Sequence, residues 1–426
     1  MVLNSPRGTS DILGVDIKYR DFIINSSREL FRLFNYSEII TPAFEHTEIF
    51  DRGIGENTDI VRKEMYTFTD KKGRSLTLRP EGTASVVRAI IEHKLYLEKF
   101  ALKLFYIGNM FRYERPQKGR MREFWQIGVE AAGVSEPLID AEVIWLLSSI
   151  FERLGFKNLK LLINSVGCLE CRNEYIKVFK SNIKPRIESL CPDCRTRYEK
   201  NPLRIFDCKV QECMSVISGS PKIYNYICSA CKEHILKVCS LLELLQINYV
   251  IKEELVRGFD YYTRTIFEII SEELQSVQNA LGGGGRYDNL ISQFGGPQIP
   301  SIGFAIGIDR TALLMKQLNI RYAESEFSPS VLVILLSGQY QSFALKIMQL
   351  FREQNITCDI SYEIKAIGSQ IKAAEKNGYS HITVIGEDEL ETGLLTVKDL
   401  KNFAQFKFDW KNEKYKISDI FRSNNK

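Results

Sequence analysis

Three arginines far apart in the chain, Arg112, Arg257 and Arg310, stand where a guanidinium could hold an anion. A planar guanidinium presents a fork of donors that suits phosphate oxygens. Arg112 ends a predicted strand, whereas Arg257 precedes a glycine and the pair Tyr261 and Tyr262. Arg310 falls in the first turn of a predicted helix, where the dipole and the free N–H groups also favour an anion. A solvated arginine or an aromatic strand core would leave the same patterns.

Residues 105–130 predict two strands joined by a basic loop at 115–122 that could grip a polyphosphate or a nucleic-acid backbone. The return strand alternates with period two, the mark of a half-buried strand. Its apolar side carries Trp125, Ile127 and Val129, and its polar side carries Gln126, Gly128 and Glu130. A glycine between two polar side chains leaves room for a small ligand. The alternative is an ordinary hairpin with a solvated outer face.

Two glycine-rich segments could bring backbone close to a ligand. In GFAIGIDR, Gly303–Arg310, a strand turns directly into a helix. In ALGGGGRYDNL, residues 280–290, the glycines are expected to touch a ligand, to adopt positive φ, or to form a flexible turn. The second segment is neither a Walker loop nor a dinucleotide fingerprint, because the residues and the strand context of those motifs are missing.

Nine of the ten cysteines lie between Cys168 and Cys239, which indicates a local cysteine cluster in a protein of a reducing compartment rather than a disulfide scaffold. Two Cys-x-x-Cys pairs separated by 19 residues fit a four-thiolate zinc pattern, and four later cysteines could complete a second set. The first set is Cys168, Cys171, Cys191 and Cys194; the second is Cys208, Cys213, Cys228 and Cys231. The spacing is compatible with structural zinc sites and also with buried thiols that bind no metal.

The overall composition excludes several classes of protein. With 426 residues, two to four domains are expected, and 44% hydrophobic residues suffice for several cores. A net charge of +4 is too small to argue for nucleic acid by itself. No apolar run approaches the ~20 residues of a membrane span, and the N-terminus lacks a secretory pattern. We therefore expect a cytoplasmic protein that does not enter membranes.

Hydrophobic periodicity predicts the elements that must position these residues. Helices are expected at 16–34, 83–94, 138–154, 308–318, 341–354 and 365–377. Strands are expected at 36–44, 159–163, 301–306, 331–336, 356–361 and 381–385, with a strand pair at 255–270. Pro42 should end the first strand, residues 48–70 should form a loop, and Thr83 should cap a helix. Beyond residue 330, alternating strands and helices predict a small α/β domain with a largely parallel sheet.

Taken in order, these motifs resemble those of class II aminoacyl-tRNA synthetases, and within that class the histidyl-tRNA synthetase family. The resemblance covers nearly the whole chain. It is carried by Arg7–Asp11, TLRPEGT at 77–83, residues 111–130, LVRGFDYYTRT at 255–265, ALGGGGRYDNL, GFAIGIDR and the C-terminal IGEDELETGLLTVKDL. LVRGFDYY and GGGGRYD are specific to the histidine branch.

The resemblance implies an α+β fold and a homodimer. The catalytic core would be an antiparallel sheet with flanking helices and a helical insertion, followed by a small α/β anticodon-binding domain. The strand ending at Pro42 corresponds to the family's dimer-interface motif. The expected divisions are core 1–164, cysteine-rich insertion 165–248, core 249–320, linker 321–329 and anticodon-binding domain 330–426.

The resemblance also implies a two-step reaction. The carboxylate of L-histidine attacks the α-phosphate of ATP and releases pyrophosphate, and a terminal ribose hydroxyl of tRNA(His) then takes the histidyl group. Arg112 and Arg257 would hold the α-phosphate from two sides, and Arg310 the distal phosphates. Mg²⁺ should accompany ATP, held mostly by phosphates and water. The resemblance does not imply a zinc site, because members of the histidine branch do not generally depend on zinc in their insertion.

The amino-acid pocket follows from the same match. Glu81 and Thr83, with Gln126, would bind the backbone end of histidine, and Gly82 and Tyr261 belong to the same pocket. Glu130 and Tyr262 would contact the two imidazole nitrogens, since a neutral ring has one donor and one acceptor. In the basic loop, Gln117 and Arg120 would meet the acceptor end of the tRNA.

Two alternatives belong to other classes. A catalytically inactive paralogue that regulates ATP phosphoribosyltransferase would keep the core fold but typically lacks the anticodon domain and the motif around Arg257. A pure nucleic-acid binding module would not need three arginines aimed at one anion. Histidine-dependent ATP–pyrophosphate exchange would separate the synthetase from both.

Overall fold

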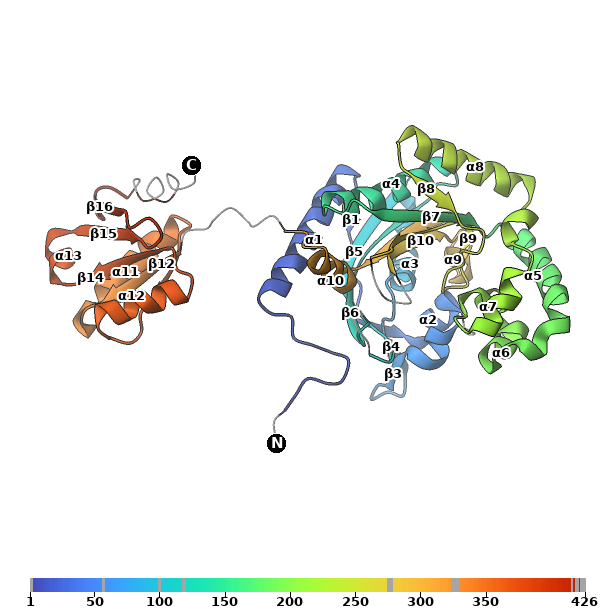
Figure 1. Cartoon of the computed structure of the whole chain (residues 1–426), viewed down its shortest axis with the longest axis horizontal. Helices are drawn as coiled ribbons and strands as arrows, with labels where there is room; N and C mark the ends of the chain where they lie inside the picture. Colours follow the sequence, from blue (N-terminus) through green and yellow to red (C-terminus); the bar gives the residue numbers. More distant parts are fainter. Residues whose placement is uncertain are drawn as a thin grey trace. The chain divides into compact units, whose positions relative to one another are not determined.

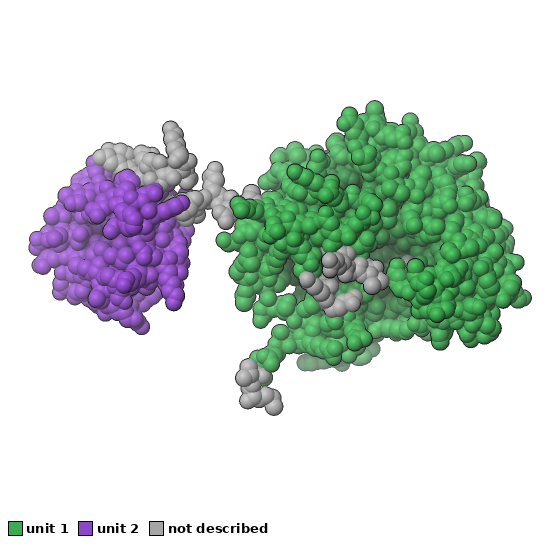
Figure 2. Space-filling view, in the orientation of Figure 1, with its two compact units in different colours: residues 1–322 green, residues 323–426 purple. Residues whose placement is uncertain are grey.

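The computed structural model describes residues 3–55, 58–98, 101–116, 120–273, 279–322 and 330–414, together with residues 417 and 421. The chain forms two compact units, Met1–Tyr322 and Ala323–Lys426 (Figure 2). From residue 323 onward, the linker predicted at 321–329 lies outside the described residues. Among the described helices, none is both long enough and apolar enough to cross a bilayer.

Unit 1 is built on a sheet of eight described strands (Figure 1). In spatial order they are β1 (Ser37–Glu38), β5 (Leu102–Phe111), β6 (Glu123–Ala132), β11 (Ser301–Gly307), β10 (Ala280–Arg286), β9 (Thr263–Ser271), β7 (Leu159–Ser165) and β8 (Tyr249–Ile251). The six inner strands pair antiparallel, and β1 and β8 join the two edges in parallel. The predicted antiparallel core is therefore confirmed.

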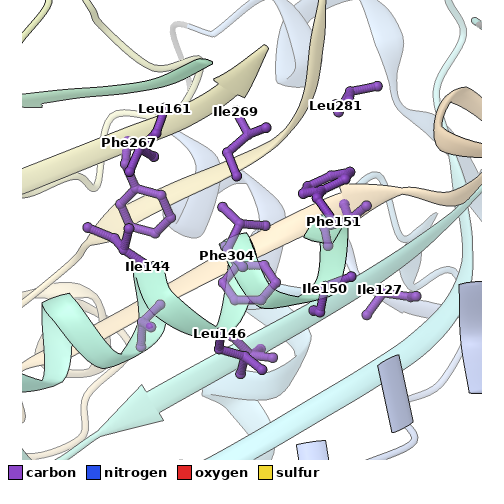
Figure 3. Packing of buried hydrophobic residues seen from close by; sticks show 14 of the residues in the cluster. Ile127, Ile144, Leu146, Ile150, Phe151, Leu161, Phe267, Ile269, Leu281 and Phe304 are labelled. Atoms are coloured by element: carbon purple, nitrogen blue, oxygen red, sulfur yellow. The ribbon is translucent and has the colours of Figure 1, made fainter. Parts of the chain in front are cut away.

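One face of this sheet packs against helix α4 (Pro137–Arg153). Pro137 suits the first turn of a helix, because no helical hydrogen bond is lost there. Fully buried side chains of α4, including Ile144 and Ile150, meet Phe267 and Phe304 from the sheet (Figure 3). Each such side chain contributes roughly 1.5–3 kcal/mol by leaving water. The sheet is thus fixed from one side, and its other face is only partly covered, by a second hydrophobic cluster.

The remaining helices and a small second sheet complete the core of unit 1. The helices are α1 (Val15–Leu33), α2 (Thr47–Ile54), α3 (Thr83–Glu92), α9 (Leu290–Gln293) and α10 (Ile308–Gln317). The small sheet has the order β2 (Phe44–His46), β4 (Ser75–Leu78), β3 (Tyr66–Thr69). The predicted helices at 16–34, 83–94 and 308–318 are confirmed.

Two predictions near the N-terminus are wrong. The strand expected at 36–44 is only the two-residue β1, and after Pro42 the chain enters a different sheet through β2. Proline cannot donate to a ladder, so pairing stops before it. The loop expected at 48–70 instead contains α2, a π-helix at Ile60–Glu64 and β3, with residues 56 and 57 outside the described residues. Its scattered apolar side chains, such as Phe50 and Ile54, are buried.

The insertion between β7 and β8 is helical, as predicted. Its helices are α5 (Leu169–Ile183), α6 (Pro192–Lys200), α7 (Gln211–Ser218) and α8 (Ser229–Leu244), with 3-10 turns at Lys184–Ser189, Pro202–Asp207 and Ile223–Tyr226. Helices α5 to α7 gather in a lobe beside the sheet, whereas α8 lies near α4 (Figure 1). The sheet therefore continues on either side of the insertion.

In the second half of the core, one prediction is wrong and the alternatives left open for another are narrowed. Residues 255–262 form a loop and only β9 is a strand, because the aromatic side chains there turn into a pocket. The four glycines at 282–285 lie inside β10 and none has positive φ, which excludes the flexible turn and the positive φ. Gly282 and Gly283 line the pocket, so the third alternative, backbone close to a ligand, stays open. A Cβ on Gly284 would lie 1.8 Å from the carbonyl oxygen of Gly303. These glycines permit close strand packing rather than a turn.

Unit 2 is the predicted small α/β domain. Its sheet has the order β13 (Thr357–Ile360), β12 (Ser330–Leu335), β14 (His381–Ile385), β15 (Leu394–Asp399), β16 (Gln405–Asp409). Strands β13, β12 and β14 are parallel, as predicted. Strands β15 and β16 extend the sheet in antiparallel orientation. The helices are α11 (Gln341–Glu353), α12 (Ile367–Lys376) and α13 (Glu387–Thr392).

Candidate active site

The face of the large sheet opposite α4 forms the floor of a cavity of about 820 Å³. Arg112, Arg257 and Arg310 all line this one cavity, although they come from three distant segments. The other predicted residues that line it are Glu81, Thr83, Arg120, Gln126, Glu130, Tyr261 and Tyr262. Gln117 lies outside the described residues. The structure thus brings together a cationic set and a set of carboxylates and phenols.

Small residues keep the floor open. On β6, Gln126 and Glu130 face the cavity, while Ile127 and Val129 between them are buried in the core. Antiparallel pairing sets Gly303 opposite Glu130 and Gly307 opposite Gln126. The Oε1 atom of Gln126 is buried with no hydrogen-bond partner among the described residues. Such an atom is expected to accept a hydrogen bond from a ligand.

Arg112 follows the end of β5 and is fixed from several sides. Its Nε donates to the carbonyl oxygen of Pro80 over 2.9 Å, and the guanidinium lies 5.2 Å from the ring centre of Phe124. A carboxylate oxygen of Glu114 is 3.9 Å from its Nη1. The side chain is held at the rim of the cavity with donors available for a further acceptor.

Arg257 approaches from the loop before β9. Its Nη1 donates to Glu268 on β9 over 2.6 Å, and its Nε is buried with no hydrogen-bond partner among the described residues. Burial works against its charge, but Tyr262 and Glu268 outweigh burial and raise the pKa of Arg257. A Cβ on Gly283 would come within 2.8 Å of this guanidinium. One glycine of β10 therefore makes room for the arginine.

Arg310 projects from the first turn of α10 and donates from Nη1 to the carbonyl oxygen of Ala280 over 2.7 Å. Burial lowers the pKa of Arg310, and the positive charges of Arg120 and Arg112 lower it further. Arg120 itself pairs with Glu114 over 3.0 Å. Cations that disfavour one another across a cavity are stabilised when an anion binds between them.

The start of α3 supplies the next part of the site. Glu81 accepts hydrogen bonds from the backbone N–H groups of Thr83 and Ala84 over 2.6 and 2.8 Å. The predicted cap by Thr83 is wrong: Thr83 is the first helical residue, and its hydroxyl donates to Glu130 over 2.7 Å. Gly82 does not line the cavity, but a Cβ there would lie 2.3 Å from the ring of Tyr106. Burial raises the pKa of Glu81.

Glu130 is the most enclosed carboxyl group of the cavity wall. Thr83 and Tyr287 both donate to it, one to each oxygen. Burial raises the pKa of Glu130 to about 8, although those hydrogen bonds lower it. A Cβ on Gly303 would fall 2.0 Å from one carboxylate oxygen, so only glycine leaves room there. The group can release or hold a proton near neutral pH as its surroundings change.

Sequence reasoning missed several cavity residues, among them Tyr106, Glu268 and Tyr287. Tyr106 fills the space above Gly82 and Gly128, whose added Cβ atoms would each lie within 2.3 Å of its ring. Alternation on β5 could have assigned Tyr106 to the polar face, because it pairs with Gly128 of β6. No local signal distinguishes Glu268, since its role depends on which strand becomes the neighbour.

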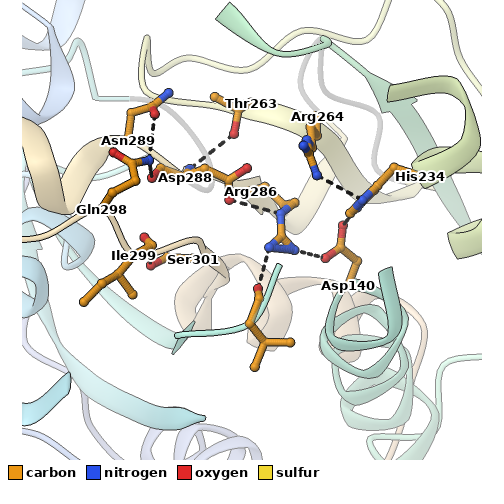
Figure 4. A network of polar contacts seen from close by, with 11 residues as sticks. Asp140, His234, Thr263, Arg264, Arg286, Asp288, Asn289, Gln298, Ile299 and Ser301 are labelled. Carbon is orange, nitrogen blue, oxygen red and sulfur yellow. Dashed lines mark hydrogen bonds and ion pairs between the residues drawn. The ribbon is translucent and has the colours of Figure 1, made fainter. Parts of the chain in front are cut away.

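Arg286 of the GGGGRYD motif does not face the cavity. It is fully buried and forms ion pairs with Asp140 of α4 and with Asp288, and it donates to the carbonyl oxygen of Val134 (Figure 4). Asp140 also pairs with His234 of α8 over 2.7 Å. This network ties β10 to two helices and thereby fixes the next residue, Tyr287, against Glu130.

The insertion closes one side of the cavity. Arg197 and Arg204 line it and pair with Asp59 over 2.8 and 3.5 Å. Asn201, between them, donates to Asp260, which precedes the tyrosine pair. The position of α6 is therefore coupled to the loop that carries Arg257.

Comparisons with known proteins agree with this arrangement. A family model for histidyl-tRNA synthetase matches residues 8–173 and 213–311, and one for an anticodon-binding domain matches residues 330–419. A curated histidine–tRNA ligase from Halothermothrix orenii is 48% identical over 406 residues, which cover 95% of this chain and 96% of the relative.

Solved structures give the same result. The apo histidyl-tRNA synthetase of S. aureus superposes with a TM-score of 0.82 at 35% identity, covering 98% of this chain and all of that one. A Bacillus halodurans protein described as an ATP phosphoribosyltransferase regulatory subunit/histidyl-tRNA synthetase reaches a TM-score of 0.63 at 20% identity, covering 90% of this chain and 98% of that one. The second similarity concerns the fold alone.

Proposed function

The chain belongs to the histidyl-tRNA synthetase family, and from that premise we propose how its cavity carries out the reaction. The activity is the ATP-dependent attachment of histidine to tRNA, with histidyl-adenylate as the intermediate and AMP and pyrophosphate as products. One observation carries the assignment of roles: three arginines and a buried carboxyl group from distant segments line a single cavity on the sheet.

In the first step, a carboxylate oxygen of histidine attacks the α-phosphorus of ATP, and the bond to pyrophosphate breaks. Negative charge spreads over the phosphoryl oxygens, so fixed cations and alignment supply most of the catalysis. Arg112, held by Pro80, and Arg257, held by Glu268, grip the α-phosphate from two sides. Arg310, on α10, binds the departing phosphates.

The carboxylate half of the cavity binds histidine. Glu81 faces the amino acid's ammonium group, with Thr83 and the unpaired Oε1 of Gln126 as further polar partners. Glu130 accepts a hydrogen bond from one imidazole nitrogen and Tyr262 donates to the other, with Tyr261 beside them. Because these groups are buried, an apolar side chain of similar size would leave them unpaired and would be rejected strongly.

Mg²⁺ accompanies ATP in this proposal. Glu114 and Glu268 line the cavity and pair with Arg120 and Arg257, so carboxylate oxygens lie beside the arginines that would hold the phosphates. Oxygen ligands of this kind suit Mg²⁺, which keeps several waters and binds mainly through phosphates. When bound, the ion neutralises charge on the departing pyrophosphate.

The second step transfers the histidyl group to a terminal ribose hydroxyl of tRNA(His), and AMP leaves. Arg120, at the rim of the cavity, and Gln117 are the proposed contacts to the acceptor end, and unit 2 is the proposed anticodon-binding domain. Because its substrates are those of translation, we assign the enzyme to the cytoplasm.

Replacing Arg120 by glutamine is expected to weaken transfer to tRNA about tenfold and to leave ATP–pyrophosphate exchange within about twofold. Each lost phosphate contact should also lower the salt dependence of tRNA binding by about one unit of log–log slope. Single-turnover transfer from preformed adenylate, measured at several salt concentrations, checks both effects. A parallel loss of exchange would assign Arg120 to ATP instead.

We also propose a homodimer formed through the region around Pro42. Ile40 is 84% exposed, and four residues further along the chain the exposed ring of Phe44 lies 6.1 Å from the exposed ring of Phe68. Exposed apolar groups gathered in one region indicate an interaction site.

Replacing Ile40 by aspartate is expected to shift the enzyme toward monomer by at least tenfold in dissociation constant, because it buries a charge in an apolar interface. Sedimentation velocity over a range of concentrations measures the shift. Tyr362, also 84% exposed but in unit 2, offers a matched control: Tyr362→Asp should leave the dimer intact. Equal behaviour of the two variants would argue against this interface.

Histidine-dependent ATP–pyrophosphate exchange tests the proposed function directly. The purified protein should catalyse exchange between ATP and pyrophosphate when histidine is present, and should not do so with any other amino acid. The inactive regulatory paralogue, the second candidate, would show no exchange at all. Loss of exchange in an Arg112→Gln variant that still binds histidine would support the assigned roles.

A further inference from the structure

We infer that the insertion binds two zinc ions, each held by four cysteine thiolates. The stem cluster consists of Cys168, Cys171, Cys228 and Cys231, and the lobe cluster of Cys191, Cys194, Cys208 and Cys213. In each cluster the four Sγ atoms lie within 4.8 Å of one another. This inference concerns metal content and stands independently of the proposed aminoacylation.

The sulfur spacing fits tetrahedral zinc. With zinc–sulfur bonds of about 2.3 Å, the edges of a tetrahedron of thiolates measure about 3.8 Å. The Sγ atoms of Cys168 and Cys171 are 3.5 Å apart, and those of Cys191 and Cys208 are 3.9 Å apart. All ten cysteines are free of disulfide bonds. Four thiolates close the coordination shell, so both sites would be structural rather than catalytic.

The structure corrects the grouping predicted from the sequence. Sequence adjacency joined Cys168 and Cys171 to Cys191 and Cys194, but α5 separates these two pairs. The chain returns to the base of the insertion only at α8, which brings Cys228 and Cys231 beside the first pair. Order along the chain was therefore a poor guide to which pairs share a metal.

Helix ends and backbone N–H groups favour the charged thiolates. Cys168, Cys191 and Cys228 stand at the N-cap positions of α5, α6 and α8, where the helix dipole stabilises a negative sulfur. The N–H of Cys228 donates to the Sγ of Cys171 over 3.1 Å, and that of Cys191 donates to the Sγ of Cys213 over 3.2 Å. Hydrogen bonds to ligating sulfurs are a regular part of metal sites.

Each ion would hold a different part of the insertion. The stem cluster joins the starts of α5 and α8, the helices next to β7 and β8, and so ties the base of the insertion. The lobe cluster joins α6 and α7, which are short; in α6 only Cys194 and Tyr198 are buried. Because α6 adds only two side chains to the apolar core of the lobe, a bound ion would supply much of what holds this helix in place.

The lobe cluster also supports the cavity wall. Cys194 lies on α6, and Arg197, on the same helix, pairs with Asp59 at the cavity. Cys208 directly follows the 3-10 turn that carries Arg204, the second partner of Asp59. Loss of the lobe ion should therefore loosen contacts at the cavity, whereas loss of the stem ion should loosen the base of the insertion.

Metal analysis of the full-length enzyme, purified without an affinity tag that binds metal, is the first test. We expect two zinc ions per chain, and release of both when the thiols are blocked with a mercurial. Cys194→Ser and Cys171→Ser should each retain one ion, and the buried Cys239→Ser, which lies outside both clusters, should retain two. Absence of zinc, with eight thiols open to reaction in the native enzyme, would overturn the inference, as would iron at these positions.

Double variants test the grouping. Cys168→Ser with Cys231→Ser removes ligands from one cluster and should leave one zinc, whereas Cys168→Ser with Cys194→Ser should leave none. The grouping by sequence order predicts the reverse. If these variants fail to fold, cobalt added to the stripped wild-type enzyme provides a second readout. Two equivalents with the spectrum of tetrahedral thiolate coordination would support the inference, and any other stoichiometry would contradict it.

Discussion

Replacing Arg257 by glutamine is expected to slow histidine-dependent ATP–pyrophosphate exchange by about a thousandfold or more. An arginine aimed at a phosphoryl group in transfer is typically worth 10³–10⁵ in rate. Arg257 meets the conditions for such an effect, since it is enclosed, held by Glu268 and has a buried Nε with no partner among the described residues. Steady-state exchange with saturating ATP and histidine measures the loss as a fall in kcat.

Arg257→Lys should recover only part of the activity, because lysine supplies charge without the planar fork. Arg88 provides a matched control: it is also largely enclosed and ion-paired, to Glu45 and Glu92, but does not line the cavity. Arg88→Gln is expected to lower stability and to leave kcat unchanged. A similar fall in kcat for both glutamine variants would mean that Arg257 acts through the fold and not on the phosphate.

The part of the site that could be predicted from the sequence lies where a local pattern fixes direction. Alternation on β6 assigned Gln126 and Glu130 to one face and Ile127 and Val129 to the other, and the structure has them so. The first turn of α10 likewise fixed where Arg310 could point. In both cases the period of one element decides the outcome, without knowledge of its neighbours.

Prediction failed where the outcome depends on what lies next to an element. Four successive glycines left a turn, positive φ and ligand contact all open, and the sequence could not show that Gly284 lies in a strand, where the backbone of Gly303 passes too close for any side chain. The aromatic run at 255–262 suggests a strand, but Tyr261 and Tyr262 are buried in the cavity wall from a loop. The cysteine grouping failed for the same reason, since it depends on how the helices return.

Replacing Glu130 by glutamine is expected to raise the KM for histidine and to lower kcat/KM for exchange by about a hundredfold. The lost interaction is a hydrogen bond to a charged group in a buried pocket, worth roughly 1.5–3 kcal/mol. ATP binding should change little, because the arginines remain. Exchange measured against histidine concentration, with KM for ATP determined in parallel, separates the two effects.

The same substitution is expected to stabilise the ligand-free enzyme at alkaline pH. The pKa of Glu130 is raised from 4.5 to about 8 by burial, so the folded chain keeps a proton that the unfolded chain has lost. Between those values stability falls as pH rises, by up to about 1.4 kcal/mol per pH unit, and levels off above pH 8. Glutamine removes this titration, so Glu130→Gln should gain most over the wild type near pH 8–9 and least near pH 5.

Denaturant unfolding of both proteins at several pH values between 5 and 9 checks the sign. Glu45, a buried carboxylate outside the cavity that pairs with Arg88, is the matched control, and Glu45→Gln should leave the KM for histidine unchanged. Opposite trends in stability and in histidine affinity for Glu130→Gln would mean that this carboxyl group is kept for recognition at a cost to the fold. A variant less stable than the wild type at every pH would show instead that the carboxyl group supports the structure through Thr83 and Tyr287.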